Sequence, residues 1–268
     1  MNLKEKVIVV TGAGDGIGRE MVFQLLAKGA KVAAVDIHDD RLSETMRMAG
    51  TLSSNLSTHV VDVADKLAVD QLPQQVLYAH NKVDAIINNA GIIQPFIKIH
   101  DLTFPLIEKV MDVNFYGTLY MTKAFLPLLL QRPDAYIVNV SSMGGYIPVP
   151  GQSVYCASKA AVKMMTEGLY AELLTTSVKV AIVFPGAVGT NISSNSGVII
   201  NHDSSKDKSS SFKPMPVERA ASIIISSMEK GKTRVFVGKD AVFMTLLYRL
   251  MPDYAIRFIA KKMAFLLN

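Results

Sequence analysis

The chain has 268 residues, of which half are hydrophobic and 19% are charged. This balance excludes a wholly disordered protein, and the length suits one α/β domain with a large core. A single cysteine, Cys156, excludes an intrachain disulfide and fits a reducing compartment. The first residues show no signal-peptide pattern, and no apolar stretch free of charges or proline is long enough to span a membrane. We therefore expect a cytoplasmic protein.

The net charge of +5 lies entirely within residues 229–268, which hold eight Lys or Arg and three Asp or Glu. A nucleic-acid-binding protein spreads its basic residues over a groove-facing surface, so we expect no nucleic-acid partner. Here the cations lie among Phe, Leu and Met. This pattern predicts that the tail contacts either a membrane surface or a subunit interface.

Short β-branched runs alternate with longer amphipathic stretches along the chain. Seven runs have the composition of strands, at residues 6–12, 31–37, 57–63, 83–90, 135–142, 178–186 and 233–238. The first helical pattern runs from Gly16 to Lys28, and helix-length stretches separate the later strands. Strands that are apolar on both faces indicate a parallel sheet covered by helices. We predict a doubly wound α/β fold in three α/β/α layers, with its ligand site at the carboxyl ends of the strands.

We expect one catalytic domain over residues 1–240, followed by a basic, apolar helical tail over residues 241–268. Residues 190–214 are rich in Ser, Asn, Asp and Lys. A loop this long inside a compact domain is usually either functional or disordered. Because it follows the carboxyl end of a strand, we interpret residues 187–215 as a substrate lid.

A glycine-rich turn, TGAGDGIG at residues 11–18, joins the first strand to the first helix. Its glycines allow a tight turn and let backbone N–H groups approach an anion. Asp36 ends the next strand, where a carboxylate can bind the ribose hydroxyls of NAD and repel a 2′-phosphate. Because no Arg or Lys stands at position 37 or 38, the pattern favours NAD over NADP. The alternatives are an ordinary strand–helix turn and an ordinary strand-end aspartate.

Further motifs follow in order: Asp62–Val63, NNAG at 88–91, Asn114 in DVNFYG, Ser142 in NVSS, YCASK at 155–159 and PGAVGT at 185–190. With the glycine turn, they make residues 5–240 resemble the short-chain dehydrogenase/reductase family. Residues 111–142 look most like its acetoin-reductase-like bacterial branch. The tail and Asp15, which lies in the glycine turn, depart from the family's common pattern.

The resemblance implies a Rossmann fold, a homodimer or homotetramer, and a set of site residues. The catalytic residues would be Asn114, Ser142, Tyr155 and Lys159. Tyr155 and Lys159 would also contact the cofactor. The other cofactor-binding residues would lie in the glycine turn and at the strand ends: Gly12, Asp15, Gly16, Ile17, Gly18, Asp36, Ile37, Asp62, Val63, Asn89, Ala90, Gly91, Pro185, Gly186, Val188 and Thr190.

Tyr155 and Lys159 are one helical turn apart and so share a helix face. A tyrosine with the ordinary pKa of about 10 is a poor base at neutral pH. We expect the Lys159 ammonium and the nicotinamide cation to lower the Tyr155 pKa; a shift of about three units takes about 4 kcal/mol. Ser142 would donate to the carbonyl oxygen of the substrate. Asn114 would hold a water that links Lys159 to solvent.

The predicted function is an NAD(H)-dependent oxidoreductase that interconverts a secondary alcohol and a ketone. The residues that follow Ser142, Gly91 and Pro185 are mostly apolar, which favours an apolar substrate. Two alternatives remain open: a non-catalytic NAD(H)-binding regulator, and the same enzyme docked on a membrane through its tail. The five histidines, at positions 38, 59, 80, 100 and 202, lack metal-ligand spacing, so we expect no metal.

Overall fold

The computed structural model describes residues 1–198 and 214–267. They contain one parallel sheet in the order β3-β2-β1-β4-β5-β6-β7. Its strands are β1 (Val7–Thr11), β2 (Lys31–Asp36), β3 (Leu56–Val60), β4 (Ala85–Asn88), β5 (Ala135–Val140), β6 (Val178–Pro185) and β7 (Arg234–Val237). The chain winds outward from β1 to β3 and then crosses back to β4 and on to β7. The strand order therefore reverses between β1 and β4, and such a switch point is where doubly wound sheets bind ligands.

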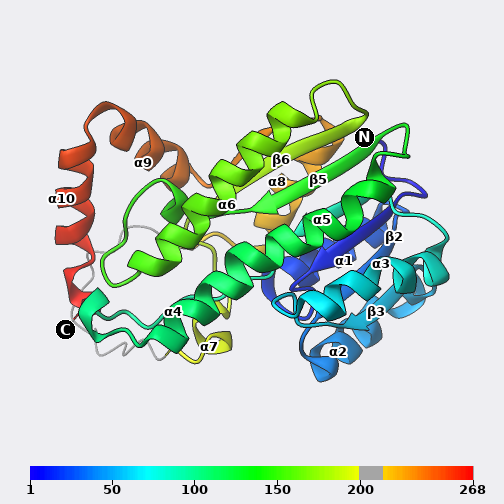
Figure 1. Cartoon of the computed structure of the whole chain (residues 1–268), viewed down its shortest axis with the longest axis horizontal. Helices are drawn as coiled ribbons and strands as arrows, with labels where there is room; N and C mark the ends of the chain where they lie inside the picture. The colour runs from blue at the N-terminus through cyan, green and yellow to red at the C-terminus, as the bar shows by residue number, and fades with distance from the viewer. Residues whose placement is uncertain (199–213, 268) are drawn as a thin grey trace.

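Helices cover both faces of the sheet (Figure 1). They are α1 (Gly16–Ala27), α2 (Asp39–Ala49), α3 (Lys66–His80), α4 (Phe104–Met111), α5 (Gly117–Leu129), α6 (Ser153–Glu172), α7 (Ile192–Asn195), α8 (Val217–Glu229), α9 (Lys239–Leu250) and α10 (Pro252–Lys262). Side chains of β1 alternate between two cores. Ile8 and Val10 pack with α1 and α8, whereas Val7 and Val9 pack with α3 and α5. The predicted three-layer α/β/α fold is confirmed.

The predicted strand ends extend too far at the edge where the site lies. The run at 83–90 ends as a strand at Asn88, because the backbone N–H groups of Asn89 and Ala90 donate to Thr11 Oγ1, at 2.9 and 3.0 Å. The run at 57–63 likewise ends at Val60. The chain leaves the ladder at these points, so the residues that follow are free to line a cleft.

Two helices follow β7 at the edge of the sheet, where the sequence predicts a helical tail; the first begins at Lys239. In Figure 1 α9 and α10 stand at the left, apart from the helices that cover the sheet. Met244 and Ile259 are buried against Ile147, just after the turn of Met143–Gly145. Among the described residues, no helix combines the length and the hydrophobicity that crossing a bilayer requires.

The predicted lid, residues 187–215, lies partly outside the described residues. Its first part contains the short helix α7. Its last residues return beside its first, because Val188 and Met215 form a parallel bridge.

Candidate active site

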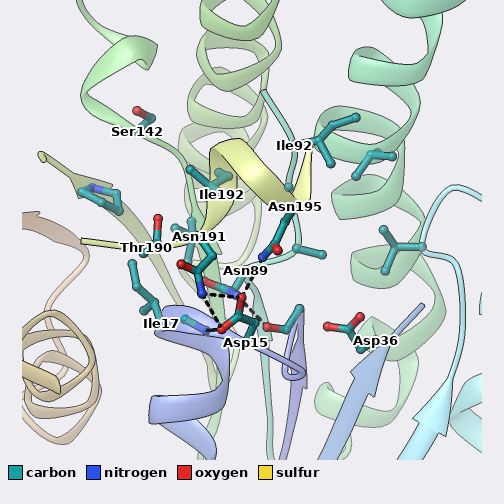
Figure 2. A pocket seen from close by; sticks show the side chains of 18 of the residues that line it. Asp15, Ile17, Asp36, Asn89, Ile92, Ser142, Thr190, Asn191, Ile192 and Asn195 are labelled. Atoms are coloured by element: carbon teal, nitrogen blue, oxygen red, sulfur yellow. Dashed lines mark hydrogen bonds between the residues drawn. The ribbon is translucent and has the colours of Figure 1, made fainter. Parts of the chain in front are cut away.

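A cleft of about 580 Å³ opens at the carboxyl ends of the strands, around the switch point. Residues of β2, β5, β6, α6 and α7 converge on it, together with residues that directly follow β1 and β4 (Figure 2). Of the predicted site residues, only Gly18 and Asn114 do not line it. The residues that do line it are Gly12, Asp15, Gly16, Ile17, Asp36, Ile37, Asp62, Val63, Asn89, Ala90, Gly91, Ser142, Tyr155, Lys159, Pro185, Gly186, Val188 and Thr190.

Backbone geometry explains the glycine turn. Gly12 has a φ of +65°, a conformation that side chains rarely adopt, and a Cβ there would meet Asn89 Nδ2 at 2.9 Å. A Cβ on Gly18 would overlap the carbonyl oxygen of Gly12. Gly18 is thus required for the close approach of α1 to the turn, which explains its absence from the lining.

Asp15 makes contacts that the sequence did not reveal. It caps α1 by accepting a hydrogen bond from Gly16 N at 2.7 Å. Its Oδ2 also accepts bonds from Asn191 Nδ2 at 3.1 Å and Asn195 Nδ2 at 2.8 Å; Asn191 directly precedes α7 and Asn195 ends it (Figure 2). Burial opposes ionisation of Asp15, but the hydrogen bonds from Asn195, Asn191 and Gly16 outweigh it and lower its pKa. Asp15 therefore joins the glycine turn to α7.

Asp36 lies at the far end of the cleft from Ser142 (Figure 2). Its Oδ2 accepts from Gly14 N at 2.9 Å and its Oδ1 from His38 N at 3.1 Å. These bonds fix the carboxylate at the end of β2. Arg41 lines the same end of the cleft and is near enough that a Cβ on Gly14 would touch both Arg41 Cβ and Asp36 Oδ2, each at 2.9 Å. Arg41 thus lies beside Asp36, the residue that is predicted to select NAD.

Tyr155 lies in the first turn of α6, and Gln94 holds that turn in place. The Gln94 side-chain oxygen accepts from the backbone N–H groups of Val154 and Tyr155, both at 3.0 Å. Its amide group donates to Gly151 O at 2.8 Å. Gln94, which follows the NNAG motif by three residues, is 1% exposed. It therefore serves as an N-terminal cap that positions Tyr155.

The electrostatics of Tyr155 differ from the expected lowering of its pKa. The ring is partly exposed to the cleft, but surrounding atoms desolvate the hydroxyl and raise its pKa to about 12, although a hydrogen bond with Ser142 counteracts this. Burial lowers the pKa of Lys159 to about 8, and its Nζ donates to Val140 O at 3.1 Å. Among the protein's own groups, desolvation of the hydroxyl outweighs the opposing effect of Ser142.

Asn114 is buried below the cleft, in a single π-helical turn (Asp112–Tyr116) between α4 and α5. Its Oδ1 accepts from Ile92 N at 2.9 Å, while its Nδ2 donates to Ile92 O and Ser158 Oγ. A Cβ on Gly91 would meet Asn114 Oδ1 at 3.0 Å and Lys159 Nζ at 3.1 Å. The Asn114 side chain thus connects Ile92 to α6, and its predicted role in holding a water beside Lys159 stays a prediction.

The cleft also contains Arg41 and Lys109, which the sequence interpretation did not assign. Arg41 had a detectable signal, because it lies in the first turn of a helix that starts at Asp39, three residues after Asp36. Asn191, Ile192 and Asn195, which also line the cleft, lie within the predicted lid. The helix α7 was not predicted there, because a stretch rich in Ser and Asn shows no apolar periodicity. Cys156 is buried.

A doubly wound sheet whose switch-point cleft contains a glycine turn, a Ser–Tyr pair and a buried lysine has the architecture of a Rossmann-fold oxidoreductase. Comparisons with known proteins give its family. Residues 6–198 match the family model described as short chain dehydrogenase. The Mycobacterium tuberculosis protein SadH is 37% identical over 264 residues, which cover 97% of this chain and 95% of SadH. The chain therefore belongs to the short-chain dehydrogenase/reductase family.

Solved structures are similar over almost the whole chain. A short-chain dehydrogenase/reductase from Burkholderia phymatum in complex with NAD has a TM-score of 0.85 at 24% identity, covering 95% of this chain and 96% of its own. A short-chain dehydrogenase from Burkholderia cenocepacia in complex with NADP has a TM-score of 0.80 at 26% identity, covering 97% and 99%. The first likeness supports the fold alone, and the second joins the sequence relatives in supporting the family.

Proposed function

We propose that this protein interconverts a secondary alcohol and a ketone by hydride transfer with NAD(H), with Tyr155 as the general acid and base. One observation carries the proposal: Ser142 and Tyr155 lie so close together in the cleft that a Cβ on Gly144 would touch both Tyr155 Cε1, at 3.3 Å, and Ser142 Oγ, at 3.5 Å, with Lys159 one helical turn further along α6. Two hydroxyls that converge from different elements can bind one carbonyl oxygen, and the buried cation beside them stabilises negative charge.

The cleft residues fit a dinucleotide. The glycine turn opens α1 toward the cleft, and Asp36 lies where a ribose would bind at the end of β2. NAD(H), when bound, supplies or accepts the hydride. Asp36 supports a preference for NAD, because its carboxylate can accept from both ribose hydroxyls and repels a 2′-phosphate. Its position at the far end of the cleft from Ser142 supports binding of the adenosine half away from the reacting atoms.

Tyr155 is the proton donor when a ketone is reduced. With a pKa of about 12 its hydroxyl is protonated at neutral pH and ready to donate to the developing alkoxide. With a pKa of about 8, Lys159 is mostly an ammonium at pH 7 and stabilises the tyrosinate that remains. For oxidation of an alcohol, Tyr155 must lose its proton near pH 7, which takes about 7 kcal/mol of added stabilisation of the anion.

The lining near Ser142 favours an apolar substrate. Ile92 and Ile192 enter this part of the cleft from two sides (Figure 2). Lys109 lines the cleft from the exposed face of α4, and nothing among the described residues pairs it with a second cation as a clamp for an anionic group. We assign the substrate to apolar secondary alcohols and their ketones.

We further propose a cytoplasmic homodimer or homotetramer. The single cysteine fits a reducing compartment. Side chains exposed on α6 and directly after it, Met164, Tyr170 and Leu174, support self-association, because exposed apolar side chains that gather on one element mark interaction sites.

The test is the Tyr155→Phe variant, measured by NADH oxidation with a panel of ketones and by NADH fluorescence titration. We expect turnover to fall by at least about 10³-fold, because the proton donor is lost, while NADH affinity stays within a few-fold. Tyr170→Phe, on the same helix but on the surface, is the matched control and keeps full activity. Activity retained in Tyr155→Phe overturns the assignment. NADH binding without turnover of any ketone by the wild-type protein favours the regulator.

A further inference from the structure

The outward face of α9 is apolar, which reverses the usual pattern of a surface helix. Phe243, Leu246 and Leu250 are 55%, 57% and 70% exposed, and Val242 is exposed beside them. The buried side of the helix carries Ala241, Met244 and Thr245. A helix that only covers the protein body shows the opposite arrangement, with polar residues facing water.

These side chains belong to a larger cluster. Of the 20 exposed large hydrophobic side chains among the described residues, seven lie between residues 242 and 256. Met251, Tyr254 and Ile256 extend the apolar face of α9 across the bend into α10. We call this set, with Val242, Phe243, Leu246 and Leu250, the tail face. Clusters of this kind on a protein surface mark a binding partner.

Five exposed cations belong to the same helices: Lys239, Arg249, Arg257, Lys261 and Lys262. Of these, Arg249 places its guanidinium carbon 5.8 Å from the centre of the Tyr146 ring, which packs with the inner sides of α9 and α10. Within the described chain, none of the five cations forms a salt bridge. The Asp240 carboxylate accepts a bond from Ala187 N at 2.8 Å and so faces the end of β6. Asp240 and Asp253 are the two acidic residues of the described tail, and only Asp253 lacks a hydrogen bond to the protein body of this kind. The tail face therefore combines exposed apolar side chains with a net positive rim.

We propose that the tail face docks on an anionic lipid surface, with α9 lying in the membrane interface and the cations contacting lipid headgroups. Apolar side chains that enter the interface beside Lys and Arg that bind anionic headgroups are the features of interfacial helices. A second copy of the chain fits less well. A two-fold symmetric contact through the tail face would bring the five cations of each copy against those of the other.

The docked surface is connected to the catalytic cleft. Met244 and Ile259, on the inner sides of α9 and α10, pack with Ile147 and Met143, and Met143 directly follows Ser142. Docking through the tail face therefore holds the Ser142 side of the cleft close to the lipid surface. An apolar alcohol or ketone dissolved in the membrane would then have a short path to the site. This consequence rests on the proposed function, whereas the docking itself does not depend on it.

The experiment is sedimentation of the full-length protein with vesicles of phosphatidylcholine, with and without about 30 mol% phosphatidylserine. We expect binding to the anionic vesicles, weakened at high salt because screening reduces the attraction of the cations. Leu246→Glu/Leu250→Glu and Lys261→Glu/Lys262→Glu should each lower binding by about tenfold or more. The readout needs no turnover, so it succeeds or fails independently of the proposed chemistry.

Matched controls use equally exposed positions elsewhere. Leu67→Glu/Tyr78→Glu replaces two apolar side chains of α3 that are 73% and 92% exposed, and Lys4→Glu/Lys123→Glu reverses two exposed lysines. Both should bind like the wild-type protein, and all variants should keep the wild-type unfolding midpoint. Wild-type protein that ignores anionic vesicles overturns the proposal, as does an equal loss in the controls. Conversion to a smaller oligomer by Leu246→Glu/Leu250→Glu, without vesicle binding by the wild type, assigns the tail face to a subunit interface instead.

Discussion

Asp36 and Arg41 lie at the same end of the cleft and differ in charge, and we propose that their balance decides the choice of cofactor. Asp36 alone predicts NAD, because its carboxylate repels a 2′-phosphate. Arg41 lines the cleft beside it and could pair with that phosphate. The two Burkholderia neighbours, one solved with NAD and one with NADP, show that this fold accommodates both cofactors.

We expect Asp36→Ala to lower the ratio of kcat/KM for NAD over NADP by about 10- to 100-fold, since it removes hydrogen bonds to a charged group worth about 1.5–3 kcal/mol. The measurement is steady-state kinetics with both cofactors. Arg41→Ala in the Asp36→Ala background should reduce the gain with NADP. An unchanged ratio in Asp36→Ala would show that another residue selects the cofactor.

The residues of the site were largely predictable, but their partners were not. Motif positions such as Tyr155 and Lys159 can be recognised in the sequence, because each motif has defined residue types at a fixed spacing. The capping of Tyr155 by Gln94 joins residues 61 positions apart, and Asn114 reaches Ile92 and Ser158 across gaps of 22 and 44 positions. Such pairings depend on how strands and helices pack, which local spacing does not report. The burial of Tyr155 and Lys159 could not be predicted for the same reason. The direction of the Tyr155 pKa shift depends on that burial, so it could not be predicted either.

At the scale of elements, α7 connects the cofactor side of the cleft to its substrate side. Asn191 and Asn195 bond to Asp15, while Ser196 Oγ, just after α7, accepts from Ile93 N at 3.0 Å. A four-residue helix has little stability of its own. Its position in the cleft therefore depends on these side-chain contacts.

Asn191→Ala/Asn195→Ala should raise the KM for the ketone several-fold while kcat changes little, because Ile192 no longer has a fixed position in the cleft. NADH affinity should stay near the wild-type value, as the glycine turn is intact. Asn55→Ala, outside the cleft, serves as the control. A loss of NADH affinity equal to the change in KM would show instead that α7 supports the cofactor itself.

Strands and helices could be predicted from the pattern of apolar residues wherever the element is well buried. All seven strands were predicted, because each carries a run of apolar or β-branched residues. The errors lie at strand ends, where Thr11 Oγ1 takes backbone donors away from the ladder, and at α7, which has no periodic apolar face. Both are places where side-chain contacts across the cleft decide the backbone.

For the whole molecule, Asp84 joins the amino ends of neighbouring strands. Its carboxylate is fully buried and accepts from Val7 N and Arg132 Nε, both at 2.9 Å, with Lys6 and Lys82 each 3.7 Å away. It lies at the opposite end of the sheet from the cleft. Its contribution is therefore to stability and can be changed without touching the chemistry.

We expect Asp84→Ala to lower the free energy of unfolding by about 3 kcal/mol, because three cations and a backbone donor lose their partner. For a chain of this size, that corresponds to a drop of roughly 6–12 °C in the melting temperature. Asp134→Ala breaks the exposed pair with Lys179 and should cost less than about 1 kcal/mol. Calorimetry checks both, and equal shifts would contradict a special role for Asp84.

The Gln94 cap has a consequence for the charge on Tyr155. Because the cap fixes the start of α6, the aligned peptide dipoles of a 20-residue helix direct their positive end toward the turn that carries this tyrosine. Side chains of a first turn lean back toward that end. The field of the helix backbone, worth about 0.3–2 kcal/mol, therefore favours the tyrosinate and acts in the same direction as Lys159. Burial raises the pKa of Tyr155, and the dipole of α6 lowers it again in part. This part of the stabilisation comes from the peptide backbone rather than from any charged side chain.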